Sequence, residues 1–497
     1  MIPELLSYPC PIGFDTIYYA WRIKEGIVWT HWSGVFGSWL LYGMLIPPHG
    51  LLSADPFLLL KLTMPLLFGL NSGGVYYVAT NVFDWSTRKS LFAAGLFSFQ
   101  VAALGISWHF YRNMLGLGLL LFTLPWIAKK ELKLRSLVQF SVLSILVTLS
   151  HEYSAVLLFA CVLGIVVSNF RSQPRTLRQA LRILASVSSV AVVFIGTVYF
   201  RAYPLAVAEP EAISALHMRG HYSGPLFFAT NYLEVLDTVQ YYPTYFDLFA
   251  SVTTLFLVLY GALLPVAIVG FFRNKVSDLW ASIACIGAFG CLVTPFCALD
   301  YWNRWMFMLV FPLTYYAANG FVKILQSSKA VTLPIPRLGL LGISKRTAKG
   351  LVLMSVVSGF VFMTSPMFYG VSGVFGIPTT VVYLPTTMLC NTVPLSDVDS
   401  VIEALQWVNT TMNHNSCFLA HDAFYHWAKF SLDKSLPIVL FKDSISRAVD
   451  LAVQRGYTCF WLLWWSTNIG WYDFDVPNCF TRVFRAGRIS VFEYTRS

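Results

Sequence analysis

The chain has 497 residues, of which 57% are hydrophobic and only 12% are charged, and its mean hydropathy is +0.63. A soluble globular protein averages about 25% charged residues, so this composition excludes a soluble domain and a disordered chain. The net charge of +10 does not indicate a nucleic-acid partner, because most Lys and Arg residues lie in short loops between apolar runs. We therefore expect a polytopic α-helical membrane protein with membrane lipid as a partner.

The N-terminal segment, residues 1–55, is expected to form an outer loop. It lacks the basic region followed by an apolar core that marks a cleavable signal peptide. Asp15 stands before a plausible helix, where it either caps the helix or has a chemical role, or does both. The apolar run 33–46 is short and ends at Pro47-Pro48, which favours an interfacial helix. The alternatives are that this run crosses the membrane or that a further span precedes the chain.

The central part, residues 56–368, is predicted to be a transmembrane domain of about ten spans. A helix needs roughly 20 apolar residues to cross a bilayer, and several of these runs are shorter. The runs are 56–82, 90–106, 113–128, 136–150, 152–170, 181–200, 248–272, 277–299, 304–325 and 350–368.

The loops between these spans alternate in charge. One alternating set holds 18 of the 34 Lys and Arg residues, and the other holds only Arg112, Arg201, Arg219 and Arg304. The positive-inside rule places the first set in the cytoplasm and the second set outside. The C-terminal tail then lies outside as well. Lys61, within the first span, is expected near its outer end, where it would meet lipid headgroups.

The tail, residues 369–497, is predicted to form a small extracytoplasmic α/β domain. The motif Ser400-x-x-Glu403 is typical of a capping box that opens a helix. Because strands and helices alternate after it, we expect a largely parallel sheet. Strands are predicted at 416–420, 437–441 and 459–465, helices at 422–430 and 445–456, and a hairpin at 482–494.

Charged and imidazole side chains gather at the outer ends of the predicted spans, where their burial would be costly. They are Asp15, His109, Arg112, His151, Glu152, Asp300 and Arg304. Most have a structural alternative: Arg112 can snorkel to headgroups, and Asp300 can pair with Arg304 one helical turn away. His109 can be an interfacial residue. His151 and Glu152 are the strongest candidates, because a carboxylate between two consecutive spans needs a partner.

These features together resemble the GT-C superfamily of membrane glycosyltransferases, which use polyprenyl-phosphate sugars. The family includes protein mannosyltransferases, aminoarabinose transferases and oligosaccharyltransferase. The motif Gly13-x-Asp15-x-x-x-Tyr19, followed by Gly26 and a Trp-rich stretch, is similar to the first outer loop of that family. In that loop an acidic residue serves as catalytic base or metal ligand. The resemblance in topology covers nearly the whole chain.

The resemblance implies a glycosyltransferase of the cell membrane that moves a sugar from a polyprenyl (dolichyl) phosphate donor to a protein, lipid or glycan acceptor outside. Asp15 would then deprotonate the acceptor, and Arg112 or Arg304 would hold the phosphate. His151 and Glu152 would orient the sugar or a metal. Further substrate contacts would come from Tyr19, His109 and Asp300.

The family's first loop often carries Asp-Glu or Asp-x-Asp, whereas Asp15 is followed by Thr16. The resemblance leaves a divalent cation, Mg²⁺ or Mn²⁺, open as a cofactor, with Asp15 and Glu152 as ligands if one binds. Two other functions stay open at this stage. A transporter would place charges near the bilayer midplane and often shows inverted repeats, whereas these charges lie at span ends. A non-catalytic GT-C-like scaffold would explain the missing carboxylate pair.

Overall fold

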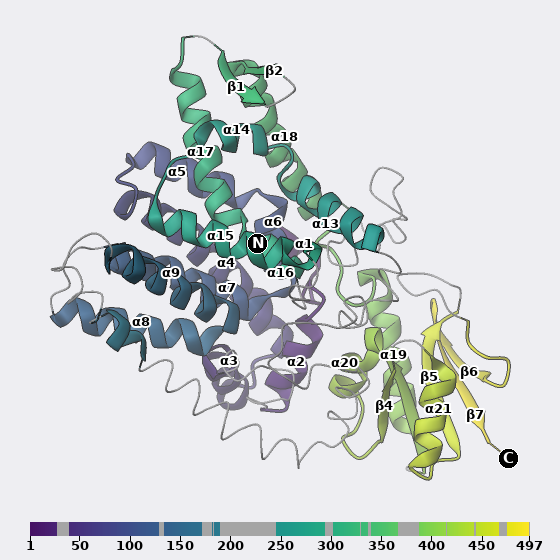
Figure 1. Ribbon diagram of the computed structural model, residues 1–497. Coiled ribbons are helices and arrows are strands. Elements are labelled where there is room, and N and C mark those ends of the chain that lie inside the picture. Colours follow the sequence, from purple (N-terminus) through teal and green to yellow (C-terminus); the bar gives the residue numbers. More distant parts are fainter. Residues whose placement is uncertain are drawn as a thin grey trace.

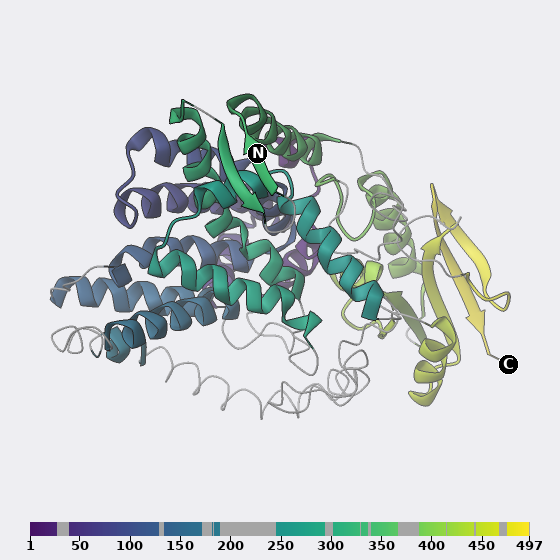
Figure 2. The same cartoon turned by 45° about the horizontal axis from the view of Figure 1, so that its top comes forward.

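The computed structural model describes most of the chain. Its N-terminal and central helices pack together on one side, and a C-terminal sheet with its own helices stands beside them (Figure 1). The same separation is visible after a rotation (Figure 2). The described residues are 1–26, 39–128, 134–170, 181, 183–188, 245–293, 302–328, 330–335, 339–365, 387–413, 415–441, 444–466 and 475–496.

Three short helices come first: α1 (Ile2–Leu6), α2 (Thr16–Lys24) and α3 (Trp39–Leu52). α3 continues through Pro47 and Pro48, so the expected end of the helix at this pair is wrong. A proline inside a helix removes a backbone hydrogen bond. Contacts of α3 with α2 and with the longer helices α4, α7 and α8 compensate for that loss.

The remaining helices of this part follow in chain order. They are α4 (Pro56–Asn81), α5 (Thr87–Ser98), α6 (Val101–His109), α7 (Tyr111–Ala128), α8 (Leu134–Ser150), α9 (Glu152–Phe170), α13 (Tyr245–Tyr260), α14 (Leu264–Gly270), α15 (Lys275–Phe289), α16 (Trp302–Met308), α17 (Val310–Gln326) and α18 (Lys345–Thr364). A hairpin of β1 (Val331–Ile335) and β2 (Gly339–Ile343) joins α17 to α18.

The described residues contain three helices that are long and apolar enough to cross a membrane: Pro56–Asn81, Trp302–Gln326 and Lys345–Thr364. The number rises to five if each of two bent pairs counts as one span. The helical membrane architecture is therefore supported, but the predicted ten spans are not confirmed. The expected span 181–200 lies largely outside the described residues.

Two expected spans are bent rather than straight. The run 90–106 forms α5 and α6, which meet at 57°, and the run 248–272 forms α13 and α14, which meet at 72°. At the first bend Gln100 is buried, and its Nε2 donates to the Thr314 hydroxyl at 2.6 Å. A break in an apolar helix persists where neighbouring helices satisfy the polar groups around it. After the bend, the end of α6 lies against the loop that contains Gly13.

The C-terminal part forms the predicted small α/β unit. Its five-stranded sheet has the order β4-β3-β5-β7-β6, with β3 parallel to β4 and β5 and with β7 antiparallel to β5 and β6. The elements are α19 (Leu395–Thr411), β3 (Ser416–His421), α20 (Asp422–Ser431), β4 (Ile438–Phe441), α21 (Ile445–Gln454), β5 (Cys459–Trp465), β6 (Thr481–Ala486) and β7 (Ile489–Thr495). The strand and hairpin predictions are confirmed.

The predicted capping box at Ser400 is wrong, because α19 already begins at Leu395. The acidic residue of its first turn is Asp397, which accepts hydrogen bonds from Trp465 Nε1 at 3.0 Å and Arg488 Nε at 2.8 Å. These bonds tie the start of α19 to the sheet. Tertiary contacts rather than a local cap thus set where the helix begins.

Lys61 does not meet headgroups, contrary to the sequence-based expectation. Its Nζ is buried against α1 and the following loop, 3.2 Å from Glu4 Oε2, 2.8 Å from Ser7 Oγ and 2.9 Å from the Cys10 carbonyl. Burial raises the pKa of Glu4 to about 7, and the positive charge of Lys61 opposes that rise. This buried pair fastens the N-terminal segment to α4, a few residues before Asp15.

Replacing Lys61 by Met should lower the free energy of unfolding by about 3 kcal/mol, because Glu4 then stays buried without its cation. The double variant Glu4→Gln, Lys61→Met should recover most of this loss, since no charge is left buried. Denaturant titration in detergent micelles measures both values. An unchanged stability of the single variant would show that the pair does not hold the segment.

Candidate functional site

The loop that carries Asp15 is held by a glycine in close contact with two other parts of the chain. Gly13 has φ of +109°, and its N–H donates to the Cys390 carbonyl at 2.8 Å. A Cβ at this position would lie 1.5 Å from the Trp108 carbonyl oxygen. The Trp108 indole in turn donates to the carbonyls of Met388 and Cys390, each at 3.1 Å. The loop is therefore clamped between the end of α6 and the segment before α19.

Asp15 occupies the N-cap position of α2, but its carboxylate makes no capping hydrogen bond. The Gly13 carbonyl accepts from the hydroxyl and the N–H of Thr16 instead, at 2.6 Å and 3.3 Å. The predicted helix start is thus confirmed, but the Asp15 side chain does not cap the helix with a hydrogen bond. Burial raises the pKa of Asp15, and the positive charges of Arg304 and Arg112 oppose that rise.

The two arginines come from different helices of the bundle. Arg112, in the first turn of α7, forms a side-chain hydrogen bond with the buried Tyr19, one turn after Asp15 in α2. Arg304, in α16, stacks its guanidinium over Phe110 at 4.7 Å and lies 6.0 Å from the Tyr153 ring. Four predicted site residues, Asp15, Tyr19, Arg112 and Arg304, therefore lie together.

A second carboxylate reaches this group from the C-terminal unit. The negative charge of Asp422 also raises the pKa of Asp15, after the larger effect of burial. Asp422 begins α20 directly after β3, and β3 lies between the parallel strands β4 and β5. Ligands of open parallel sheets bind beyond the carboxyl ends of strands at such a reversal in strand order. That position after a predicted strand was the sequence signal that could have identified Asp422 as a site residue.

His151 lies close to this group and has a clear structural contact. It is buried, and its Nδ1 accepts a hydrogen bond from the Tyr153 N–H at 3.2 Å, at the start of α9. Its ring lies 5.1 Å from that of Tyr153, which also approaches Arg304. His151 thus occupies one edge of the site. The side chains of His109 and Glu152, and all of Asp300, lie outside the described residues.

Glu152, which was expected to bind a divalent cation together with Asp15, has its side chain outside the described residues. Among the described residues, no group of three or more His, Cys, Asp or Glu side chains could hold a metal ion. The charges that act on Asp15 are those of two guanidinium groups, which would repel a cation, and that of the Asp422 carboxylate, which would attract one. Guanidinium groups instead match the oxygens of a phosphate or carboxylate in bidentate fashion. The arrangement can hold an anion beside a carboxylate base.

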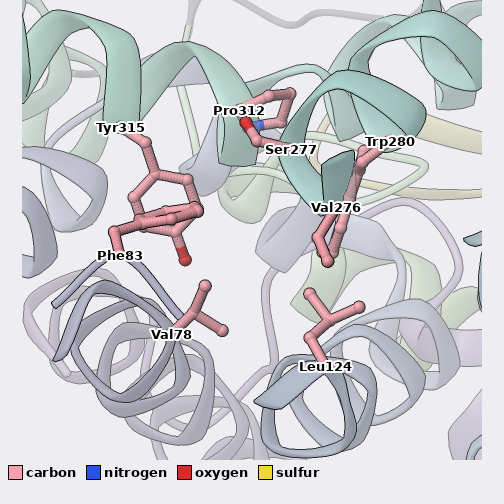
Figure 3. Close-up of a pocket in the computed structure, with 8 residues that line it drawn as sticks. All are labelled: Val78, Phe83, Leu124, Val276, Ser277, Trp280, Pro312 and Tyr315. Carbon is pink, nitrogen blue, oxygen red and sulfur yellow. The ribbon is translucent and has the colours of Figure 1, made fainter. Parts of the chain in front are cut away.

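An apolar pocket lies elsewhere, between α4, α7, α15 and α17 (Figure 3). Its lining residues are Val78, Phe83, Leu124, Val276, Ser277, Trp280, Pro312 and Tyr315. Along α4, Val78 is about 25 Å from Lys61 at 1.5 Å per residue. The pocket is therefore near the opposite end of the helices and is not part of the Asp15 site.

The seam between α2 and α20 is made of aromatic rings, one ion pair and a hydrogen bond from a lysine to a backbone carbonyl. The His426 ring lies 4.9 Å from that of Tyr18 and 5.9 Å from that of Trp21. Lys24 donates to the Phe430 carbonyl, and Glu25 pairs with Lys434. Burial lowers the pKa of His426 to about 4. The charge of Asp422 raises this pKa, and the charge of Lys429 lowers it further. These contacts fix α20, and with it Asp422, against the helix that carries Asp15.

The comparisons with known proteins give a fold but no sequence relative. No model of a known family and no curated protein matches the chain. ArnT from Cupriavidus metallidurans, solved bound to undecaprenyl phosphate, is similar in structure with a TM-score of 0.50 and 12% identity over 99% of this chain and 96% of that one. The Archaeoglobus fulgidus oligosaccharyltransferase, solved with Zn and sulfate, is similar with a TM-score of 0.50 and 12% identity. The match covers 93% of this chain and 67% of that one.

Both neighbours are membrane glycosyltransferases with the GT-C fold. The protein is accordingly a helical membrane protein with a GT-C-like fold, as the resemblance of its sequence features to that superfamily implied. At 12% identity the likeness establishes the fold alone.

Gly13→Ala should destabilise the protein by at least about 3 kcal/mol, because both the left-handed backbone and the contact with Trp108 oppose a side chain. Gly26→Ala is the matched control: Gly26 has φ of +66° but nothing within 4 Å of its Cβ position, so only strain of about 1 kcal/mol applies. Melting temperatures of the two variants separate strain from contact. Equal losses of stability in the two variants would mean that the close contact of residue 13 with Trp108 adds nothing to the cost of the substitution.

The seam should weaken in acid. A free histidine titrates near 6.5 and His426 near 4, so between these values the unfolded chain binds a proton that the folded chain does not. Stability therefore falls as pH drops from 6.5 towards 4. His426→Phe should remove roughly 1 to 2 kcal/mol of that loss, less than the full shift because the ring is partly exposed. Melting temperatures of the parent protein and of His426→Phe between pH 6.5 and 4 test this prediction. Identical pH profiles of the two proteins would contradict it.

Proposed function

We propose that this protein is a membrane glycosyltransferase that moves a sugar from a polyprenyl (dolichyl) phosphate donor to an acceptor hydroxyl on the outer face of the membrane. One observation carries the proposal: the positive charges of two arginines from separate helices, Arg112 and Arg304, act on the side chain of Asp15. A carboxylate next to an anion site is what transfer from a sugar phosphate requires. The GT-C-like fold supports the same reaction class.

The donor phosphate would bind to the guanidinium groups of Arg304 and Arg112. The phosphate is the leaving group, and its charge increases as the bond to the sugar breaks, so fixed cations stabilise the transition state. Phe110 and Tyr153 flank Arg304 and hold its guanidinium plane in place. The similar ArnT was solved bound to undecaprenyl phosphate, which supports a lipid phosphate as the ligand class.

Asp15 would act as general base. The acceptor oxygen attacks the anomeric carbon, the bond from that carbon to the phosphate oxygen breaks, and the acceptor proton passes to Asp15. One carboxylate acting as base implies inversion at the anomeric carbon. Because burial raises the pKa of Asp15, the carboxylate is a stronger base than an exposed aspartate.

The other predicted residues take supporting roles in this proposal. His151 and Glu152 would orient the donor sugar from the start of α9, and Tyr19 would position Arg112 through their hydrogen bond. His109 and Asp300 would contact substrate. The C-terminal region, residues 369–497, would lie on the outer side with the site, because the seam between α2 and α20 joins them.

The test is transfer from a radiolabelled polyprenyl-phosphate sugar by the purified chain in nanodiscs. Asp15→Asn should reduce transfer at least 100-fold, in the range expected for loss of a general base, while leaving polyprenyl phosphate binding intact. Arg304→Gln should instead weaken that binding, because the leaving phosphate loses a cation. Thermal melting checks that both variants fold.

The outcomes separate the proposal from its rivals. Near-full transfer by Asp15→Asn would remove Asp15 from the mechanism. Uptake of a solute into sealed vesicles without any transfer would favour a transporter. Binding of polyprenyl phosphate without turnover of any sugar donor would favour a non-catalytic scaffold.

A further inference from the structure

Three basic residues from separate elements gather at the end of the helical bundle that is remote from the Asp15 site. Lys89 lies in the first turn of α5, Arg273 lies in the loop after α14, and Lys323 lies in the last turn of α17. Arg273 and Lys323 are exposed, and Lys89 is half-buried. We call these three residues the distal basic cluster.

The helix α4 places this cluster at the other surface of the membrane. From Lys61 to Asn81 the helix covers about 30 Å at 1.5 Å per residue, which is the thickness of the hydrocarbon core of a bilayer. The Trp85 N–H donates to the Ala79 carbonyl in the last turn of α4 at 3.0 Å. The Lys89 ammonium lies 3.8 Å from the centre of the Trp85 ring. The cluster is therefore separate from the Asp15 site.

The buried Asn319 of α17 joins the elements that carry the cluster. Its Oδ1 accepts from Lys89 Nζ at 2.5 Å, and its Nδ2 donates to the Gly270 carbonyl of α14 at 2.7 Å. Arg273 follows Gly270 by three residues, and Lys323 follows Asn319 by one helical turn, on the same side of α17. All three basic residues thus lie within about one turn of the groups that this single amide connects.

Close packing fixes the frame on which the cluster stands. The helices α14 and α17 touch so closely that a Cβ at Gly320 would lie 1.9 Å from the Val266 carbonyl oxygen. The Phe272 ring, next to Arg273 in the chain, lies 5.7 Å from the Trp85 ring that carries Lys89. A frame that is already fixed loses little conformational entropy when a ligand binds.

In the part of the chain that the structure describes, no carboxylate forms an ion pair with the distal basic cluster. The ion pairs there involve other lysines and arginines, and none includes Lys89, Arg273 or Lys323. The positive charge of Lys323 moreover acts on Lys89. Like charges held together on a fixed frame cost free energy, which an anion between them would offset. The cluster therefore fits an anionic ligand.

Exposed apolar side chains continue from the cluster along the same elements. Leu91, two residues after Lys89 in α5, is 57% exposed, and Ile268 and Phe271, just before Arg273, are 53% and 54% exposed. Exposed apolar surface on a membrane protein is where hydrocarbon chains pack. A ligand that matches both surfaces has an anionic group next to hydrocarbon chains. This is the chemistry of a membrane lipid rather than that of a soluble anion or an acidic peptide.

We propose that the distal basic cluster binds the headgroup of an anionic glycerophospholipid, whose acyl chains lie along α5 and α14. Arg273 and Lys323 contact the phosphate oxygens, and Lys89, held by Asn319 and Trp85, adds its charge from the side. A zwitterionic headgroup carries its own cation beside the phosphate, so the cluster favours a lipid with net negative charge. The proposal needs only the membrane location of the bundle and does not rest on the proposed reaction.

Native mass spectrometry of the full-length protein, released from detergent micelles, tests this site. The probes are dioleoyl phosphatidylglycerol and dioleoyl phosphatidylcholine, which differ only in the headgroup. The first phosphatidylglycerol should bind about tenfold more tightly than the first phosphatidylcholine, and Arg273→Gln and Lys323→Gln should each weaken its binding about fivefold. Arg135→Gln is the matched control, because this exposed arginine at the start of α8 carries the same charge and lies on another helix. Its binding should be unchanged.

Each other result would contradict a defined part of the proposal. Equal affinities for the two lipids, or equal losses in Arg273→Gln and Arg135→Gln, would overturn the site. Displacement of the lipid by equal concentrations of inorganic phosphate or of a polyglutamate peptide would overturn the lipid assignment. Loss of phosphatidylglycerol binding in Arg304→Gln, rather than in Arg273→Gln, would place the lipid at the Asp15 site instead. Lys323→Gln provides the same readout if Arg273→Gln does not fold.

Discussion

The Asp15 carboxylate is largely removed from water, and the surrounding structure offsets the electrostatic cost of that desolvation. An unpaired charge in such a place would simply bind a proton, because desolvation disfavours the ionised form. The guanidinium groups of Arg112 and Arg304 oppose that effect, while Asp422 adds to it. The balance leaves a carboxylate that is more basic than one in water and still next to cations. The proposed base and the proposed anion site would thus depend on one arrangement of charge.

This arrangement draws on parts of the chain that are far apart in sequence. Gly13 allows the Asp15 loop to touch Trp108 and Cys390, and the pair of Lys61 with Glu4 holds the segment before it. Each contact fixes the loop from a different side. A carboxylate on a loop needs such support, because a shift of about 1 Å at a reacting group can cost 100-fold in rate. The clamp is therefore as much a part of the site as the charges are.

The C-terminal unit does more than cover the bundle. Its helix α20 packs on α2, and the residue at its start, Asp422, faces the same carboxylate as the bundle arginines do. Asp15 is thus subject to positive charge from the bundle and to negative charge from α20.

Much of this was determined by the sequence itself. Composition defines a membrane protein, the alternation of strands and helices after residue 416 defines the sheet, and the spacing from Gly13 to Tyr19 indicates the loop of the site. These are local patterns, since hydropathy and periodicity act over neighbouring residues. Only the tertiary structure decided that Lys61 is buried and paired with Glu4, and that α19 starts at Leu395. It also decided that the charge of Asp422 acts on Asp15. These outcomes depend on contacts between residues tens to hundreds of positions apart, and no local pattern records them, because the energy of such contacts appears only when the chain is packed.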